Sequence, residues 1–434
     1  MRVRQLRPSV PREVELTVAL VSGSHAINHL YLVLLPPIFG ILAGEFDVGL
    51  ATLGLAVGTQ GAFNMVFQLP FGYVSDNHSR LLALCSGLGL ASVGVLVTAF
   101  ALTIEWVFVG QAILGIGIAA HHPAHFPMLS AATSSENRGR VFSIHSFSGN
   151  IGYAAAPTLI VALTRLNGVT WRAVFVFAAV LGAGYGLLCL LVFGRYVGST
   201  ITRREETGGG DSSDASLADE TRHATARERV RNGLESLTTS PAIVALAVLA
   251  LVTGIANWGI RSYAVVLLTD GYGLDLGLAN VLYTAMFVVT AIIILVGGDL
   301  ADRISAESIL LTSYGGLLVA ALVVGSFLLP PLLAGVAVIL AGGSIGFGGP
   351  ARSKLTDKLS AQADLGTNFA VITVGITLAG SVAPPAFGVI IDHTSFSTAF
   401  LVIGSVGAVC IALTLAILQR YGTGFERESP IEAD

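Results

Sequence analysis

Long apolar stretches alternate with short polar segments along almost the whole chain. Each stretch holds about 20 or more residues with few charges, which is the length that an α-helix needs to cross the ~30 Å hydrocarbon core of a bilayer. Twelve such stretches are present, at about 15–41, 51–74, 81–103, 106–130, 141–163, 173–194, 242–268, 278–298, 308–328, 332–351, 367–391 and 396–419. The pattern predicts an all-α membrane protein with twelve transmembrane helices.

The composition agrees with this prediction and excludes a water-soluble globular protein. Charged residues make up 12% of the chain and hydrophobic residues 53%, whereas a soluble domain has about 25% charged residues. This small number of charged residues could not cover the apolar residues in water. The lipid bilayer is therefore the expected partner. The net charge of −4 gives no indication of a nucleic-acid partner.

The positions of Lys and Arg predict the orientation. If the loops are assigned alternately to the two sides, 20 of the 23 Lys and Arg residues fall on the side of the N-terminus. The opposite side holds Arg165 and Arg172, and Arg261 lies within an apolar stretch. Because cytoplasmic loops carry an excess of these residues, we expect a multi-pass protein of the cell membrane with both termini in the cytoplasm.

Three short motifs occur twice, and each pair is separated by 226 or 227 residues. They are GYVSD and GDLAD at 72–76 and 298–302, HHPA and GGPA at 121–124 and 348–351, and AAPT and VAPP at 155–158 and 382–385. A constant spacing indicates an internal duplication. It predicts two six-helix bundles, 1–197 and 241–434, joined by a cytoplasmic linker at 198–240.

The first repeated motif resembles the signature that the major facilitator superfamily carries between its second and third helices, G-x-x-x-D-x-x-x-[RK]. The matching residues are Gly72, Asp76 and Arg80 in the first half and, in a shorter copy, Gly298, Asp302 and Arg303 in the second. The resemblance implies a cytoplasmic gate, which holds this side shut while the other side is open. A solvated turn is the alternative, with Asp76 as the N-cap of the third helix.

A narrower resemblance is to the fosmidomycin-resistance branch of this superfamily. It is carried by HAINHLYLVLLPPIFGIL, QLPFGYVSD, GIGIAAHHPA and SFSGNIG, in which the matching residues are His25, Tyr31, His122, Pro123, Gly149 and Asn150. Two positions differ, because Asn28 stands where the branch carries Asp and Gln111 where many antiporters carry Arg. The resemblance implies export of a small polar solute against protons.

Arg261 is the leading candidate for a binding residue, because a permanently charged group inside the membrane is costly and marks a functional position. One interpretation is that its side chain snorkels to the outer interface. The other, which we favour, is that it faces a cavity between the two halves and binds an anion. The substrate-binding candidates are Arg261, Tyr263, Asn257, Trp258, His25, Asn28, Tyr31, Gln60, Asn64, His122 and Asn150.

Six histidines fall in the first, fourth and fifth stretches, where no carboxylate is evident at mid-depth. Because histidine titrates near neutrality, His25, His122 and His145 are candidates for proton coupling. Hydrogen bonding between helices is the alternative for each of them. HHPAH also suggests a metal site, but no carboxylate or thiolate stands nearby and Pro123 distorts the turn, so no metal is expected.

The sequence contains no phosphate-binding GxxxxGK[ST] loop, and nothing in it indicates an enzyme or a cofactor. The expected function is proton-coupled efflux of a small polar solute, with an anion favoured, by a monomeric secondary transporter that works by alternating access. Two alternatives stay open. One is uptake of an organic anion by the same fold, and the other is a membrane sensor that signals through 198–240.

Overall fold

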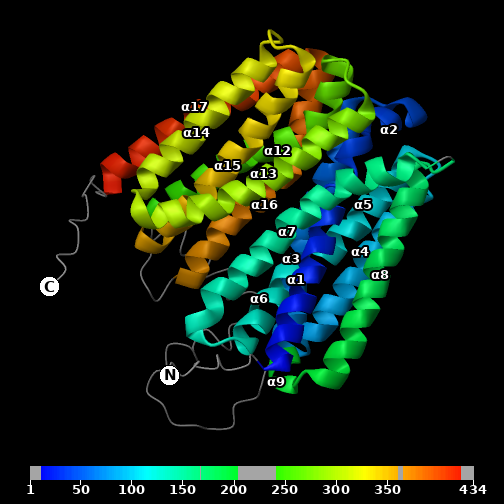
Figure 1. Cartoon of the computed structure of the whole chain (residues 1–434), viewed down its shortest axis with the longest axis vertical. Coiled ribbons are helices and arrows are strands. Elements are labelled where there is room, and N and C mark those ends of the chain that lie inside the picture. The colour runs from blue at the N-terminus through cyan, green and yellow to red at the C-terminus, as the bar shows by residue number, and fades with distance from the viewer. Residues whose placement is uncertain (1–10, 167, 204–240, 360–364, 422–434) are drawn as a thin grey trace, which may run out of the picture.

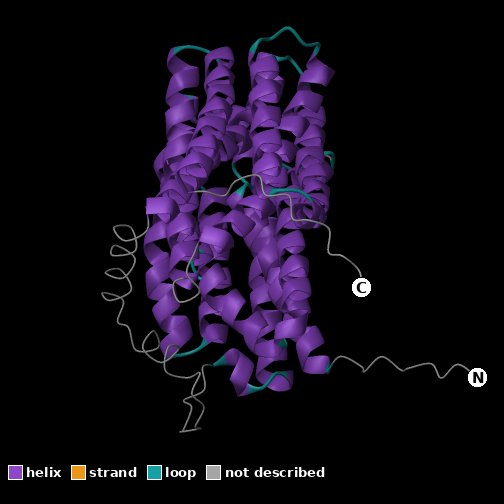
Figure 2. Ribbon diagram, turned by 90° about the vertical axis from the view of Figure 1, so that its left-hand side faces the viewer, coloured by secondary structure: helices purple, strands orange, loops and turns teal. Residues whose placement is uncertain are grey.

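The structure, a computed structural model, describes residues 11–166, 168–203, 241–359 and 365–421 (Figure 1). Every regular element in these ranges is a helix (Figure 2). The first half contains α1 (Arg12–Leu32), η1 (Pro36–Ile38), α2 (Phe39–Phe46), α3 (Leu50–Asn77), α4 (Arg80–Ala99), α5 (Ile104–Ile118), α6 (His121–Ala132), α7 (Ser135–Thr164), α8 (Trp171–Tyr196) and α9 (Ser199–Thr202). The second contains α12 (Pro241–Val266), η2 (Leu267–Gly271), α13 (Leu276–Arg303), α14 (Ala306–Gly325), α15 (Pro331–Leu359), α16 (Leu365–His393) and α17 (Phe396–Tyr421).

Two of the predicted stretches are interrupted rather than continuous. The first consists of α1, η1 and α2, because Pro36 and Pro37 lack the N–H that would continue the helical hydrogen bonding. The fourth is divided into α5 and α6 at Ala119 and Ala120. Pro123 lies in the first turn of α6, where its missing N–H costs least. The second break places the HHPAH segment at the start of α6.

Eleven described helical segments are long and apolar enough to cross a membrane, and the chain is therefore a multi-pass membrane protein. They account for every predicted stretch except 141–163, which lies in α7. This helix has 30 residues, but it includes His145, Ser146, Ser148 and Asn150, which lower its hydropathy. The twelfth crossing and the sides of the two termini remain predictions.

The helices pack mainly within their own half of the chain. In the first half α1 packs against α7, and α4 against α5 and α8, while in the second α12 packs against α16, and α14 against α15 and α17. The halves are joined mainly by α3 with α16 and by α7 with α13, and α12 also contacts η1 and α2. Figure 1 shows the two groups of helices diverging toward the end where α1 begins and α17 ends. Most of the predicted linker, 204–240, lies outside the described residues.

Small residues allow α3 and α16 to approach closely at the other end of the molecule. A Cβ atom on Gly58 would lie 2.6 Å from the carbonyl oxygen of Ser381, and one on Gly61 would lie 2.9 Å from the backbone of Gly380. Helix backbones in membranes come this close only where side chains are small. We call this junction of 50–61 with 380–392 the distal contact, because it lies away from the start of α1 and the end of α17.

Candidate functional site

A cavity of about 370 Å³ lies between α7 of the first half and α12, α13 and α15 of the second. This volume is within the range of small-molecule sites, which combine apolar walls with a few polar groups. We call it the central cavity. It is lined by Asn150, Asn257, Arg261, Met286, Phe287, Thr290, Ile294, Gly342, Ile345, Gly346, Gly349, Pro350, Arg352 and Ser353.

Arg261 projects from α12 into the central cavity, and aromatic rings surround its guanidinium. The guanidinium carbon lies 4.2 Å from the ring centre of Tyr153, 5.8 Å from that of Trp258 and 5.7 Å from that of Phe287. Cation–π contacts of this kind stabilise the charge without neutralising it. None of the described carboxylates forms a salt bridge with Arg261, so its charge remains available to an anionic ligand.

Arg352, from α15, is a second arginine in the wall of the same cavity. The sequence interpretation assigned it to a cytoplasmic loop just beyond the tenth stretch. The loop placement is wrong, because α15 continues through Arg352 to Leu359, and the cytoplasmic side stays a prediction. A signal for this residue was present in the sequence, since the repeat aligns HHPAH at 121–125 with GGPAR at 348–352. Arg352 therefore occupies the position in the second half that His125 occupies in the first.

Of the predicted binding residues, Arg261, Asn257 and Asn150 line the central cavity. Trp258 borders it through its contact with the Arg261 guanidinium. Asn150 is the one lining residue contributed by the first half, and its side-chain amide donates to the Ser146 carbonyl oxygen at 3.1 Å.

Tyr31 and Tyr263, expected at equivalent cavity-facing positions, lie elsewhere. The Tyr31 hydroxyl is buried in the first half and donates to the Ala178 carbonyl oxygen at 2.9 Å. The Tyr263 hydroxyl is buried in the distal contact, between the carbonyl oxygens of Leu50 and Pro384. Each phenol hydroxyl has backbone oxygens as its hydrogen-bond partners. Each tyrosine therefore links neighbouring helices and does not face the cavity.

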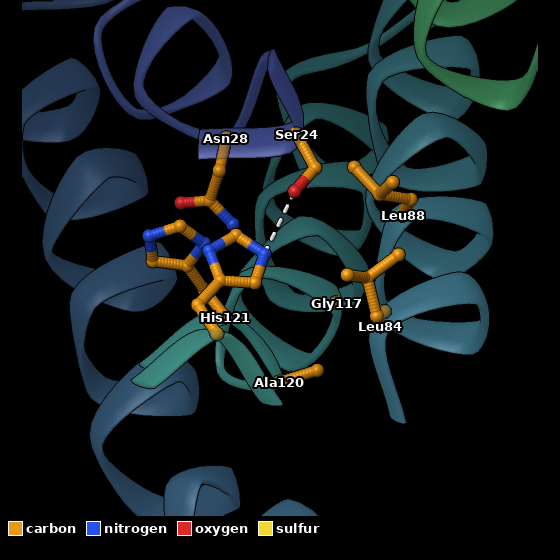
Figure 3. Close-up of a pocket in the computed structure, with 9 residues that line it drawn as sticks. Ser24, Asn28, Leu84, Leu88, Gly117, Ala120 and His121 are labelled. Atoms are coloured by element: carbon orange, nitrogen blue, oxygen red, sulfur yellow. Dashed lines mark hydrogen bonds between the residues drawn. The ribbon is translucent and has the colours of Figure 1, made fainter. Parts of the chain in front are cut away.

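Three further candidates also lie away from the central cavity. Gln60 is 1% exposed and is buried between α3 and α5. Asn64, one turn further along α3, accepts from the Gln68 amide at 3.5 Å. Asn28 donates to the Ile118 carbonyl oxygen at 3.5 Å and lines a much smaller cavity beside His121 (Figure 3).

Six of the histidines in the first half form one cluster, built from α1, α6 and α7. We call His25, His29, His121, His122, His125 and His145 the histidine cluster. The ring of His25 stacks on that of His145 with 3.9 Å between their centres, and it lies 4.3 Å from that of His121. His122 differs, because it is exposed and stacks on Phe126 at 5.3 Å. Of the three proton-coupling candidates, His25 and His145 are therefore buried together, whereas His122 is exposed.

A single aromatic ring connects the histidine cluster with the central cavity. His29 stacks on Tyr153 with 4.1 Å between ring centres, and the opposite neighbour of Tyr153 is the Arg261 guanidinium at 4.2 Å. The two polar sites of the protein are therefore in contact through Tyr153, although no direct bond between them is formed among the described residues.

The predicted gate residues lie at the end where the two halves diverge. Gly72 and Asp76 belong to the last turns of α3, and Arg80 begins α4, where it donates to the carbonyl oxygens of Thr200 and Ile201 at 3.3 and 3.2 Å. The N-cap of α4 is Ser79, whose hydroxyl accepts from the Leu82 N–H at 3.2 Å. Asp76 is therefore not the cap that the alternative interpretation proposed.

The second copy of the gate motif has a similar local structure, except that its arginine ends one helix instead of beginning the next. Gly298, Asp302 and Arg303 lie in the last turns of α13, and Ser305 caps α14 as Ser79 caps α4; the Asp302 side chain is outside the described residues. Neither glycine packs closely against another helix: among the described residues, no atom outside its own helix lies within 4 Å of the position of a Cβ on Gly72 or Gly298.

Comparison with known proteins agrees with this architecture. The family model of the Major Facilitator Superfamily matches residues 21–382 and 246–433. The crystal structure of a bacterial homolog to human lysosomal transporter Spinster, in an inward-facing and unoccupied conformation, superposes with a TM-score of 0.78. That comparison covers 94% of this chain and 98% of the other at 15% identity.

Two curated relatives from Escherichia coli (strain K12) match over shorter segments. The inner membrane transport protein YajR is 31% identical over 30% of this chain and 28% of its own length. The fosmidomycin resistance protein is 27% identical over 37% of this chain and 39% of its own length. The matched segments thus span less than half of either relative. The family model and the fold together show that this chain belongs to the Major Facilitator Superfamily, as a membrane transporter and not an enzyme.

Proposed function

We propose that the protein transports a small anionic solute by alternating access, and that this solute binds in the central cavity between Arg261 and Arg352. The observation that carries the proposal is the presence of these two arginines, from α12 and α15, in one cavity wall. Neither forms a salt bridge with a described carboxylate. Two permanent charges inside the membrane require compensation, which an anionic solute supplies.

The neutral polar groups of the cavity suit recognition of the same kind of ligand. Asn150, Asn257, Thr290 and Ser353 can each donate a hydrogen bond. Guanidinium groups bind planar or tetrahedral oxyanions in a bidentate manner. A solute with one carboxylate or phosphoryl group and several hydroxyls matches this set of donors.

Alternating access requires that the two ends of the molecule open in turn. The distal contact closes one end, while the gate residues Gly72, Asp76 and Arg80 lie at the other end, where the helices diverge (Figure 1). If the termini are cytoplasmic, as the Lys and Arg distribution predicts, this arrangement is open to the cytoplasm. The gate of Gly72, Asp76, Arg80, Gly298, Asp302 and Arg303 then closes the cytoplasmic side in the opposite state.

Ligand-induced thermal stabilisation of the detergent-purified protein tests the binding site. The panel contains phosphonates, sugar phosphates, carboxylates, amino acids and lipophilic cations. We expect an anion to raise the melting temperature of the wild type but not that of Arg261→Ala. Arg195→Ala is the matched control, because Arg195 also lies over an aromatic ring, that of Tyr196, but outside the cavity. Equal stabilisation of wild type and Arg261→Ala would contradict the anion site.

Efflux coupled to protons remains part of the proposal, with uptake of an organic anion as the alternative direction. Proteoliposomes loaded with the stabilising anion and a pH-sensitive dye measure both properties. We expect an imposed pH gradient to accelerate anion movement and anion movement to carry protons the opposite way. Movement that is independent of the gradient would remove proton coupling and leave the anion site intact.

A membrane sensor that retained the transporter fold is the second class of function. The two copies of the gate motif favour a transporter, because a protein that does not alternate has little use for two gates. Replacement of the predicted linker 204–240 by a flexible segment of equal length distinguishes the two. A transporter keeps its solute flux after this replacement, whereas a sensor loses its output.

A further inference from the structure

The histidine cluster contains buried nitrogen atoms for which the described residues provide no hydrogen-bond partner. One of these atoms is Nδ1 of His29, which is half-buried. The others are Nε2 of His121, Nδ1 of His125 and both ring nitrogens of His145, whose side chains are 5%, 2% and 1% exposed. Buried polar groups are nearly always satisfied, and exceptions in a native structure indicate an unseen ligand, ion or water. We call His121, His125 and His145 the histidine triad.

The hydrogen bond between Ser24 and His125 orients one of these nitrogens. The Ser24 hydroxyl donates its single proton to the Val21 carbonyl oxygen at 2.9 Å, and its oxygen lies 2.8 Å from Nε2 of His125. Because a hydroxyl has one proton, Nε2 of His125 is the donor in the second contact. In neutral His125 the unpartnered Nδ1 then carries a free lone pair. An imidazole nitrogen with a free lone pair is the form that binds a metal ion.

The positions of the three side chains suit one ion. His121 and His125 are one turn apart on the same face of α6, which is a spacing that lets two imidazoles share a metal. His145 approaches from α7, and one ring nitrogen from each residue lies within 4.8 Å of the others. The nitrogens need to approach one another by only about 1–1.5 Å to surround an ion with metal–nitrogen distances of about 2.0–2.1 Å.

We propose that the histidine triad binds a transition-metal ion of the Zn²⁺ class. Imidazole ligands suit Zn²⁺, Co²⁺, Ni²⁺ and Cu²⁺, whereas Mg²⁺ and Ca²⁺ require oxygen ligands that the triad does not offer. This site is separate from the solute site proposed above, and neither depends on the other. Sequence spacing had favoured no metal because it could not show that α7 adds His145 to the pair on α6.

Room for one water molecule lies beside two members of the triad, His121 and His125. A cavity of about 10 Å³ is lined by His121 and His125 together with Ser24 and Asn28 (Figure 3). This is about the space that one water molecule needs. Three histidines with a water or hydroxide in the fourth position form a common zinc coordination. Hydroxide in this position would also reduce the net charge of the buried ion.

Other residues of the cluster position the triad. His25 donates from Nδ1 to the carbonyl oxygen of His145 at 2.7 Å, because a carbonyl group can only accept. This bond holds the backbone of His145 against α1. Ser24 orients the His125 ring in the same way that outer-shell partners orient metal-bound imidazoles in other proteins.

Metal titration of the full-length protein, purified without a polyhistidine tag and treated with a chelator, tests the proposal. Co²⁺ is the probe, because its visible absorption reports tetrahedral nitrogen coordination, and Zn²⁺ should displace it. We expect one equivalent of Co²⁺ per chain in the wild type. His125→Gln and His145→Gln should abolish the absorption, and His78→Gln should retain it, since His78 is exposed and outside the cluster.

A second variant and a second readout keep the test decisive if the glutamine variants fail to fold. Ser24→Ala leaves every histidine in place and should weaken Co²⁺ binding about 10- to 100-fold, which is the usual effect of losing an outer-shell partner. Zn²⁺ should also raise the melting temperature of the wild type by joining α6 to α7. No Co²⁺ absorption in the wild type, or absorption unchanged in His145→Gln and Ser24→Ala, would overturn the proposal.

Discussion

The carboxylate of Asp392, in the second half of the chain, caps the helix that begins at Leu50 in the first half. Its Oδ1 accepts from the Leu50 N–H at 3.0 Å and its Oδ2 from the Ala51 N–H at 2.8 Å. A carboxylate at a helix N-terminus satisfies free N–H groups and interacts favourably with the helix dipole. Because the two residues belong to different halves, this cap must break whenever the distal contact opens.

Removal of this cap should shift the protein toward the state in which the distal end is open. A helix cap contributes about 0.5–2 kcal/mol, so Asp392→Ala should raise the population of that state by about 2- to 30-fold. Spin labels at Leu102 and Leu328, which are 84% and 85% exposed in loops of the two halves, provide the measurement. We expect a longer label separation in Asp392→Ala than in the wild type.

Asp275→Ala is the matched control for Asp392→Ala. Asp275 also caps a helix, accepting from the Leu278 N–H at 3.0 Å, but both residues belong to the second half. Its removal should lower the melting temperature without changing the label separation. If both variants give the wild-type separation, the Asp392 cap has no part in closing the distal end.

Arg352 should contribute to solute binding as strongly as Arg261, although only Arg261 was identified from the sequence. Loss of a charged hydrogen-bonding group costs about 1.5–3 kcal/mol, so Arg352→Ala should weaken binding of the stabilising anion about 10- to 150-fold. Arg352→Lys should show an intermediate loss, because lysine keeps the charge but cannot bind an oxyanion in a bidentate manner. Calorimetric titration of the purified variants measures both effects, and wild-type affinity in Arg352→Ala would remove this residue from the site.

Gly72→Leu should slow transport without loss of stability or solute affinity. Among the described residues, no atom outside its own helix lies within 4 Å of the Gly72 Cβ position, so this structure has room for the leucine side chain. If the halves pack closely at Gly72 when the gate closes, the same side chain prevents closure. Gly194→Leu is the matched control, since Gly194 is also helical and has no neighbour within 4 Å. Wild-type transport rates in Gly72→Leu liposomes would show that the gate glycine is not closely packed in any state.

Gly58→Leu should have the opposite structural effect. A Cβ at this position would lie 2.6 Å from the Ser381 carbonyl oxygen, and a backbone atom cannot move aside as a flexible side chain can. The substitution should therefore separate α3 from α16 and lengthen the distance between labels at Leu102 and Leu328. An unchanged label distance in a folded Gly58→Leu protein would contradict the distal contact. The Gly72→Leu protein, in contrast, should retain the short separation seen here.

The amino-acid sequence by itself determined the class of protein, its helical content and its family. These properties depend on local features, namely the length of apolar stretches and a motif repeated at constant spacing, and both can be read without knowing which helices touch. The placement of Arg261 in a cavity could also be predicted, because a lone charge in an apolar stretch has few stable surroundings. Asn150 and Asn257, predicted as binding residues, line the same cavity, and their part in binding stays a prediction.

Tertiary structure decided the roles of residues whose environment comes from other helices. Tyr31 and Tyr263 looked like cavity residues. Both are instead buried, and their hydroxyls donate to backbone carbonyl oxygens of distant helices. Arg352 looked like a loop residue, yet α15 extends far enough to carry it into the central cavity. The histidine triad was not evident either, because the packing of α6 beside α7 places His145 against a pair that is some 20 residues away in sequence. Sequence patterns report the faces of single helices, whereas a binding site depends on which faces meet.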